Sequence, residues 1–251
     1  MTPCLNARET LPETLSSVRA QQVEGLEHVV VDGGSTDGTV DLLRDAEGIR
    51  WVSEPDRGLS HAFNKGVQMA GGDVVGWLNA DDVYLPGALA RVQAAFAARP
   101  DAEWATGRCR IVDRDGSEIR GWVTRYKDLF LRRYRFGLHL VQNFVSAPST
   151  FVRRDAFLEL GGLDERFRYS MDYDLWLKLG RRGPPLIIPE QLASFRMAEG
   201  SLSMSGFEHQ FEEHTLNARE HGAGHPVAVA LNAVISRLIV LTYRVLRRRS
   251  A

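Results

Sequence analysis

The chain has 251 residues, enough for one or two domains with a sizeable hydrophobic core. Hydrophobic residues make up 44% of it and charged residues 25%, which excludes a disordered chain, a collagen-like repeat and a coiled coil. The 31 basic and 32 acidic residues give a net charge of −1, so the composition does not indicate nucleic-acid binding.

Residues up to Phe96 alternate between segments typical of helices and segments typical of strands. A helix is predicted from Leu11, where Thr10 and Glu13 have the spacing of a capping box. The further elements, in chain order, are strand 28–31, a helix around 40–43, strand 49–53, helix 62–69, strand 74–78 and helix 86–96. Because apolar strands separated by helices are typical of a parallel sheet covered on both faces, we expect a doubly wound, mostly parallel α/β fold.

The remainder of the chain is less regular. A hairpin turn is predicted at 113–116, between strands over 108–112 and 118–123, followed by a helix over 173–179 and a short strand over 187–189. From Val227 onward, apolar residues recur at helical spacing, with arginines mostly on the opposite side. This pattern predicts an amphipathic helix that lies in a membrane interface or packs against the rest of the chain or a second subunit.

The cysteines and the chain start bear on location. Cys4 and Cys109 form no metal-binding pair and are typical of free thiols in a reducing compartment. The first residues lack the basic and apolar regions of a signal peptide. Since no uncharged apolar stretch reaches about 18 residues, we expect a cytoplasmic protein without a spanning helix. The inner face of the membrane is then a candidate surface for the amphipathic helix.

Acidic residues follow two of the predicted strands. Asp32 and Asp81 lie at carboxyl ends of strands, where parallel sheets bind their ligands. The pair Asp81 and Asp82 offers oxygen ligands of the kind that hold Mg²⁺ or Mn²⁺ together with substrate phosphates; the alternative is a solvated loop or a helix cap. The glycine-rich run 32–38 allows close approach of a ligand, or else forms a turn whose polar residues cap the next helix.

Two more aspartates, Asp172 and Asp174, lie at the start of the helix predicted near 173–179. Residues two apart do not share a helix face. We therefore predict that one of them caps the helix and that the other faces a cleft.

Taken together, several segments resemble a family-2 glycosyltransferase of the GT-A fold. The resemblance covers residues 1–200, and order and spacing both fit. The segments that carry it are TPCLN (2–6), VVDGGSTDGT (30–39), SEPDRG (53–58), NKG (64–66), WLNADD (77–82) and DYDLW (172–176).

The resemblance implies an inverting enzyme that moves a sugar from a nucleotide-diphosphate donor, with UDP-sugars favoured, to an acceptor hydroxyl. The acceptor would be a saccharide or lipid-linked molecule in cell-envelope polysaccharide or glycolipid assembly. Mg²⁺ or Mn²⁺ is implied as cofactor, held by Asp81, with Asp172 as general base. Arg196 and Ser201 resemble a loop that closes over the diphosphate; a surface arginine is the alternative for Arg196. The donor-binding residues implied are Thr2, Pro3, Asp32, which accepts a hydrogen bond from the nucleotide base, Asp56, Asn64, Asn79, Asp82 and Arg196.

The chain departs from the family pattern at three positions. Asn79 stands where many relatives carry aspartate, Met171 where glutamate often precedes the base, and His61 where the residue is often acidic; we assign His61 a structural role. Asn79 and Met171 favour one alternative, a catalytically degenerate nucleotide-sugar-binding partner subunit. A second alternative, a sugar-phosphate nucleotidyltransferase, is disfavoured because its glycine-rich start bearing Arg or Lys is missing.

We expect residues 1–204 to form the glycosyltransferase domain and residues 205–251 a C-terminal helical segment able to lie on a membrane. Relatives carry an apolar strand ahead of the Thr-Pro segment, whereas here Met1 directly precedes Thr2. We therefore expect either an upstream start or a shortened first strand.

Overall fold

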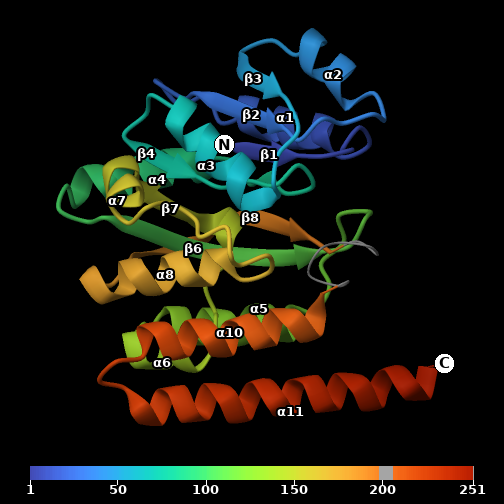
Figure 1. Cartoon of the computed structure of the whole chain (residues 1–251). Helices are drawn as coiled ribbons and strands as arrows, with labels where there is room; N and C mark the ends of the chain where they lie inside the picture. Colours follow the sequence, from blue (N-terminus) through green and yellow to red (C-terminus); the bar gives the residue numbers. More distant parts are fainter. Residues whose placement is uncertain (198–205, 251) are drawn as a thin grey trace.

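The computed structural model (Figure 1) describes residues 1–197 and 206–250, and the strands among them form two sheets. In the first, sheet A, the described strands run parallel in the order β1-β2-β3. All residues of β2 are buried, as expected for a strand covered on both faces. The parallel sheet predicted from the sequence is therefore confirmed for this part. The elements are β1 (Thr2–Cys4), α1 (Leu11–Arg19), β2 (His28–Asp32), α2 (Thr39–Asp45), β3 (Ile49–Ser53) and α3 (Leu59–Met69).

The start of α1 differs from its prediction. Among the described contacts, Thr10 makes no side-chain capping hydrogen bond, so the predicted capping box is not formed. The Glu13 carboxylate pairs instead with the guanidinium of Arg196, 183 residues later in the chain. Glu13 therefore forms a long-range ion pair in place of the local capping contact that its spacing from Thr10 predicts.

The second sheet, sheet B, is mixed. Its described strands lie in the order β4-β7-β6-β8-β5, with β6 and β8 parallel and the other neighbours antiparallel. The prediction of a mostly parallel sheet is wrong here, because strand direction depends on a distant partner that a local apolar run does not encode. The strands are β4 (Val74–Gly76), β5 (Val83–Tyr84), β6 (Trp104–Val112), β7 (Thr150–Arg153) and β8 (Leu186–Arg196).

Two hydrogen bonds of Met1 join the sheets. The Met1 amino group donates to the Gly76 carbonyl at 3.1 Å, and the Leu78 N–H donates to the Met1 carbonyl at 3.1 Å. One residue bonded to two positions two apart on its neighbour is the pattern of parallel strands. The chain after β4 therefore runs in the same direction as β1 and β2, which brings the segment after Leu78 to the edge where β2 ends.

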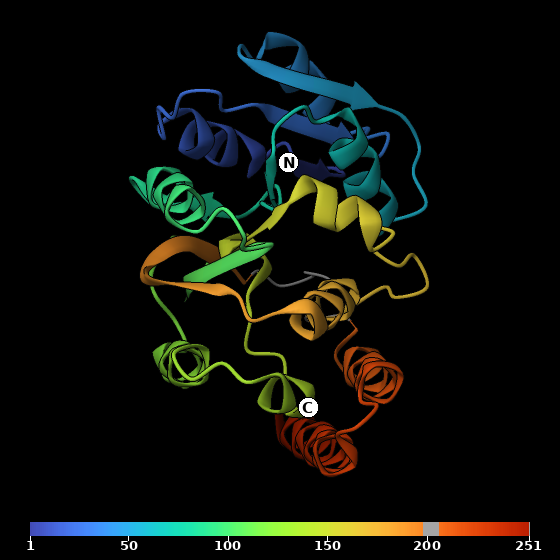
Figure 2. The ribbon, with the colours of Figure 1, turned by 90° about the vertical axis from the view of Figure 1, so that its left-hand side faces the viewer.

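Helices cover sheet B in two layers. Figures 1 and 2 show α8 between sheet B and the helices α6 and α10, with α11 outermost, while α5 lies beside them and packs directly on β6. The largest core cluster joins α3, sheet B and α8, where the Trp104 and Trp176 rings stack at 6.0 Å. These helices are α4 (Ala88–Ala98), α5 (Gly121–Leu131), α6 (Phe136–Val141), a 3₁₀ turn (Ala147–Ser149), α7 (Arg154–Glu159), α8 (Met171–Arg182), α10 (Phe207–His221) and α11 (Pro226–Ser250).

The predicted hairpin after β6 is confirmed in part. The turn forms as expected, with the Asp113 side chain accepting the N–H groups of Asp115 and Ser117. The returning arm, however, is a single bridge at Glu118, and α5 begins at Gly121. The predicted strand over 118–123 is therefore wrong, because the chain turns into a helix there.

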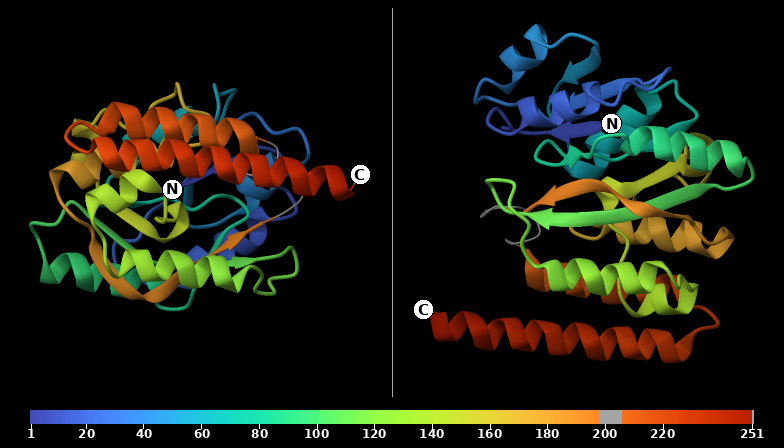
Figure 3. Two further views of the ribbon diagram at one scale, coloured as in Figure 1. Left: turned by 90° about the horizontal axis from the view of Figure 1, so that it is seen from below. Right: turned by 180° about the vertical axis from the view of Figure 1, so that it is seen from behind.

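Helix α11 crosses the underside of the molecule beside α10 (Figure 3). Its segment Pro226–Val245 has a mean hydropathy of 1.7, and 11% of the window is buried. By length and composition this segment is able to cross a membrane. The sequence criterion for a spanning helix admitted only stretches without charged residues. It therefore passed over this segment, which contains Arg237 and Arg244.

Candidate active site

Asp32 ends β2 and is held by a ring of donors. Its carboxylate accepts the N–H groups of Gly34 and Ser35 at 3.1 and 2.9 Å, the Ser53 hydroxyl at 2.7 Å and the Ser35 hydroxyl. Burial alone would raise the pKa of Asp32, but these hydrogen bonds outweigh it and the pKa is lowered. Asp32 is therefore a fixed carboxylate at the carboxyl end of sheet A.

The loop after Asp32 serves two purposes. Asp37 accepts the N–H and hydroxyl of Thr39 at the start of α2, so the predicted helix-start role of this loop is found at Asp37. At Gly33 the loop touches Asp56, because a Cβ built there would lie 2.6 Å from Asp56 Oδ2. Glycine at this position lets the Asp56 carboxylate lie against the Asp32 loop without being displaced.

Asn79, Asp82 and Arg196 form one interlocked group. The Asn79 amide accepts the Trp77 indole N–H at 2.7 Å and donates to Asp82 Oδ2 at 3.1 Å. The other oxygen of Asp82 accepts the Arg196 N–H at 2.8 Å. Burial, then repulsion from Asp81, holds the pKa of Asp82 well above its ordinary value. Asp82 is fully buried, so it shapes the turn that presents Asp81.

Arg196 has partners that the sequence did not suggest. Its guanidinium donates to the carbonyl oxygens of Asp81 and Arg114 and to the Glu13 carboxylate, and the residue is buried. It therefore fastens the Asp81 turn to the rest of the fold in this structure. Ser201, expected in the same loop, lies outside the described residues.

Asp81 is the candidate metal ligand. Its carboxyl is partly exposed, and burial raises its pKa. No group of three or more His, Cys, Asp or Glu side chains in the described part of the chain forms a metal site by itself. Mg²⁺, however, is typically bound by one or two carboxylates together with substrate phosphates. Asp81 beside the buried Asp82 fits that pattern, since a cation would offset the repulsion between the two carboxylates.

Asp172 lies in the first turn of α8. Its Oδ1 accepts the Tyr173 N–H at 2.8 Å. Burial raises the pKa of Asp172, while the Tyr173 N–H, the Lys127 ammonium and the Asn143 amide act in the opposite direction. The net effect is a raised pKa of Asp172, and shifted pKa values of this kind are common at sites of proton transfer. Met171, the departure from the family pattern, is buried in the core.

Lys127 and Asn143 are functional candidates that the sequence analysis missed. Lys127 lies on α5, and its Nζ donates to the Ser146 hydroxyl at 3.1 Å. The available signal was its place on the helix face of Thr124 and Leu131, which is buried. Asn143 follows α6 in irregular chain, where no pattern marked it.

Strand β6 lies within electrostatic range of both Asp82 and Lys127. Burial raises the pKa of its Cys109 to about 12; the Asp82 charge raises it further, and the Lys127 charge lowers it. Lys127 in turn lies within electrostatic range of Asp172. Strand β6 pairs with β8, whose Arg196 N–H binds Asp82. It also contacts α5, which carries Lys127, through the Arg108–Asp128 ion pair.

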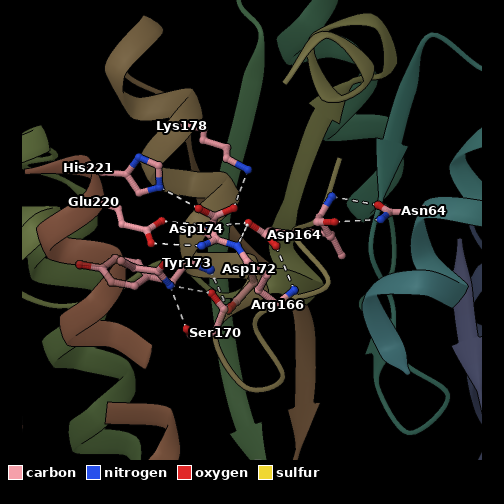
Figure 4. Close-up of polar contacts among 12 residues, drawn as sticks. Asn64, Asp164, Arg166, Ser170, Asp172, Tyr173, Asp174, Lys178, Glu220 and His221 are labelled. Atoms are coloured by element: carbon pink, nitrogen blue, oxygen red, sulfur yellow. Dashed lines mark hydrogen bonds and ion pairs between the residues drawn. The ribbon is translucent and has the colours of Figure 1, made fainter. Parts of the chain in front are cut away.

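Asp174 has a different environment from Asp172. It is 1% exposed and pairs with Lys178 and His221, both at 2.7 Å (Figure 4). The two aspartates have different surroundings, as predicted, but the prediction that one of them caps the helix is wrong, because the N-cap residue of α8 is Ser170. Asp174, however, anchors α10 and faces no cleft.

The remaining predicted donor residues have structural partners. Asn64 accepts the Leu163 N–H and donates to the Leu163 carbonyl, both at 2.8 Å (Figure 4). Thr2 is fully buried with its hydroxyl 2.9 Å from His28 Nε2, and Pro3 is buried beside it in β1. Two residues after β1, the exposed Asn6 accepts the Thr36 N–H at 2.9 Å, a contact that the sequence did not predict.

Comparison with known proteins gives a consistent result. Residues 1–161 match the family described as glycosyl transferase family 2. A Mycobacterium tuberculosis protein named as an uncharacterized glycosyltransferase is 31% identical over 201 residues, 78% of this chain and 73% of its own length. A Rickettsia felis protein of the same description is 28% identical over 188 residues, 72% of this chain and 31% of its own length.

Solved structures share the fold. The mannosyltransferase PcManGT of Pyrobaculum calidifontis, in complex with GDP-Man and Mn²⁺, has a TM-score of 0.68 at 18% identity. That match covers 98% of this chain and 78% of the other. S. aureus TarS 1–349 in complex with UDP-GlcNAc has a TM-score of 0.65 at 16% identity, over 86% of this chain and 64% of the other. These similarities extend the fold comparison into the C-terminal helices.

Proposed function

The chain belongs to glycosyl transferase family 2, and we propose that it is an inverting enzyme that transfers a sugar from a nucleotide-diphosphate donor to an acceptor hydroxyl. The observation that carries this proposal is that Asp32 ends β2 while the segment leading to Asp81 runs parallel to β1 and reaches the same edge of the sheet, where ligands of such folds bind. A UDP-sugar is the favoured donor on family resemblance; TarS was solved with UDP-GlcNAc and PcManGT with GDP-Man.

The donor is held at the carboxyl end of sheet A. Asp32, kept ionised by its ring of donors, accepts a hydrogen bond from the nucleotide base. Asp56 and Asn79 border the same edge, beside the Asp32 loop and the Asp81 turn. Asp81 would hold a divalent cation, which would stabilise the negative charge on the departing nucleoside diphosphate.

The acceptor is activated by Asp172. Its carboxylate takes the proton of the acceptor hydroxyl as the new bond to the anomeric carbon forms. The old bond from that carbon breaks at the same time, and its electron pair leaves on the diphosphate oxygen. One displacement inverts the anomeric centre, and a positioned base of this kind typically contributes about 10² to 10⁴-fold. The raised pKa of Asp172 makes it a stronger base than an exposed aspartate.

A membrane surface is the proposed partner of α11. The helix exposes an apolar stripe formed by Val227, Leu231, Val234, Leu238, Leu241 and Val245. Arginines accompany the stripe at Arg237 and Arg244, and the sequence adds a run at 247–249. Apolar side chains flanked by basic ones bind the interface of a bilayer containing acidic lipids. This location suits a lipid-linked acceptor on the cytoplasmic side.

Thermal unfolding with a panel of nucleoside diphosphates and nucleotide sugars, with and without Mn²⁺, tests the donor site. A ligand at about a hundred times its Kd stabilises by about 2.7 kcal/mol, which for this size raises Tm by about 5–10 °C. We expect one nucleotide to raise Tm in a Mn²⁺-dependent way. Asp81→Ala should abolish the Mn²⁺-dependent part, whereas the control Asp73→Ala, an exposed aspartate before β4, should keep it. No rise with any nucleotide contradicts the proposal.

A further inference from the structure

Helix α10 forms hydrogen bonds with the chain just before Asp172. The Glu213 carboxylate accepts three successive backbone N–H groups, those of Arg168, Tyr169 and Ser170, at 2.9, 2.8 and 2.8 Å. It also accepts the Ser170 hydroxyl at 3.2 Å. An anion at the start of a helix is favoured by the free N–H groups and by the helix dipole. Glu213 therefore acts on the N-terminus of α8 from a different helix.

Asn217, one turn further along α10, binds the same segment. It is 0% exposed, and its amide donates to the Ser170 carbonyl at 3.1 Å and to the Ser170 hydroxyl at 2.9 Å. Between them, Glu213 and Asn217 bind the N–H, the carbonyl and the hydroxyl of Ser170. Ser170 is the N-cap residue of α8 and lies two residues before Asp172.

The same loop is fixed at its other end. Asn64 on α3 binds both backbone groups of Leu163, and Arg166 pairs with Asp164 and with Glu220 on α10 (Figure 4). The segment from Leu163 to Ser170 is thus held between α3, beside sheet A, and α10. Each end of the segment is held by its own set of hydrogen bonds. The position of α8 relative to sheet A therefore depends on these contacts as well as on the hydrophobic core.

We propose that Glu213 and Asn217 are positioning residues for the general base Asp172. Both side chains fix the first turn of α8, from which the Asp172 carboxylate projects, and they act through Asp172 without touching substrate. A displacement of about 1 Å at a reacting group can cost about 10²-fold in rate. The inference rests on the proposed function, since it presupposes that Asp172 accepts the proton. It also assigns a catalytic purpose to α10, which lies outside the matched residues 1–161.

Glu213→Gln in the full chain tests this proposal. The substitution keeps the shape of the side chain but removes its charge and one acceptor. We expect kcat for nucleoside diphosphate release to fall about 10 to 100-fold, with the donor KM changed less than twofold. Donor-binding stoichiometry, measured on the same samples, corrects for any unfolded fraction. Glu212→Gln is the matched control, because it makes the same change one residue earlier, where the side chain is exposed and pairs with His209.

A double substitution separates this inference from the proposed function. In an Asp172→Asn background, Glu213→Gln should cause no further loss, because no base remains to be positioned. If Asp172→Asn alone keeps full turnover, the proposed base is wrong. If Asp172→Asn abolishes turnover but Glu213→Gln leaves kcat unchanged, or lowers kcat only in proportion to donor-binding stoichiometry, the positioning role is wrong. Should Glu213→Gln not fold, Ser170→Ala removes the hydroxyl contacts alone, and an unchanged kcat would then refute the proposal.

Discussion

The carboxyl group of Asp172 is balanced between burial, which raises its pKa, and the neighbouring Tyr173 N–H, Lys127 ammonium and Asn143 amide, which lower it. Asp32 shows the opposite outcome, because its hydrogen bonds outweigh burial and lower its pKa. The two carboxylates of the proposed site thus have pKa values that their surroundings shift in opposite directions. This divergence suits Asp32 to bind as an anion and Asp172 to accept a proton.

Lys127→Met should move the pH dependence of turnover. Without the ammonium, the pKa of Asp172 rises further. The base works only when ionised, so the acid limb of the kcat profile should move to higher pH, with activity lost below the limb and retained above it. Profiles of kcat against pH for the two proteins measure this shift. Lys178→Met, which removes the partner of Asp174 instead, should leave the limb in place; a limb that does not move in Lys127→Met contradicts the assignment.

At the scale of the elements, α11 shows how a helix divides its surface. One side docks on the molecule, where the buried Asn232 donates to the carbonyls of Leu140 and Val141 and the Tyr243 ring lies 4.2 Å from Phe207. The other side exposes the apolar stripe, with Leu238 56% and Leu241 58% exposed. A helix that is docked and still apolar on its outer side requires a further partner for that side.

Leu238→Glu should weaken binding to vesicles that contain acidic lipids. A charge in the middle of the stripe loses apolar burial and repels acidic headgroups. Gln93→Glu places the same charge at an exposed position of α4, away from α11, and should retain the binding. Flotation measures the bound fraction. Equal flotation of wild type and Leu238→Glu would contradict a membrane role for the stripe, and resistance of the bound protein to carbonate extraction would indicate spanning instead of surface binding.

At the scale of the whole molecule, local patterns predicted elements better than partners. The strand over 49–53 is confirmed residue for residue, and the helix over 62–69 begins earlier, at Leu59. The relative directions of the strands in sheet B could not be predicted, because β6 pairs with β8, a strand that starts only at Leu186 and carries no local signal of this pairing. Arg196 and Asn64 were predicted at the donor, but their long-range contacts with Asp81 and Leu163 have no local signal.

Local motifs locate the proposed site residues unequally well. Asp32, Asp81 and Asp172 lie where strand and helix ends place them, and those positions follow from short motifs. Glu213 was missed, because an acidic pair in a helix is usually solvated and its partners lie more than 40 residues away. The geometry that holds a catalytic group is thus less visible in sequence than the group itself.

The assignment of Asp172 as the general base is best tested by the turnover of Asp172→Asn, measured together with donor affinity on the same protein. The assay follows nucleoside diphosphate release with Mn²⁺, the donor found by thermal unfolding and a mixture of saccharide and lipid-linked acceptors. We predict that kcat falls by about 10² to 10⁴-fold while the donor Kd changes less than twofold. Asp155→Asn, which alters an exposed aspartate in the first turn of α7, should keep wild-type turnover. Undiminished turnover in Asp172→Asn, or a wild type that binds donor and never releases diphosphate, would contradict the account.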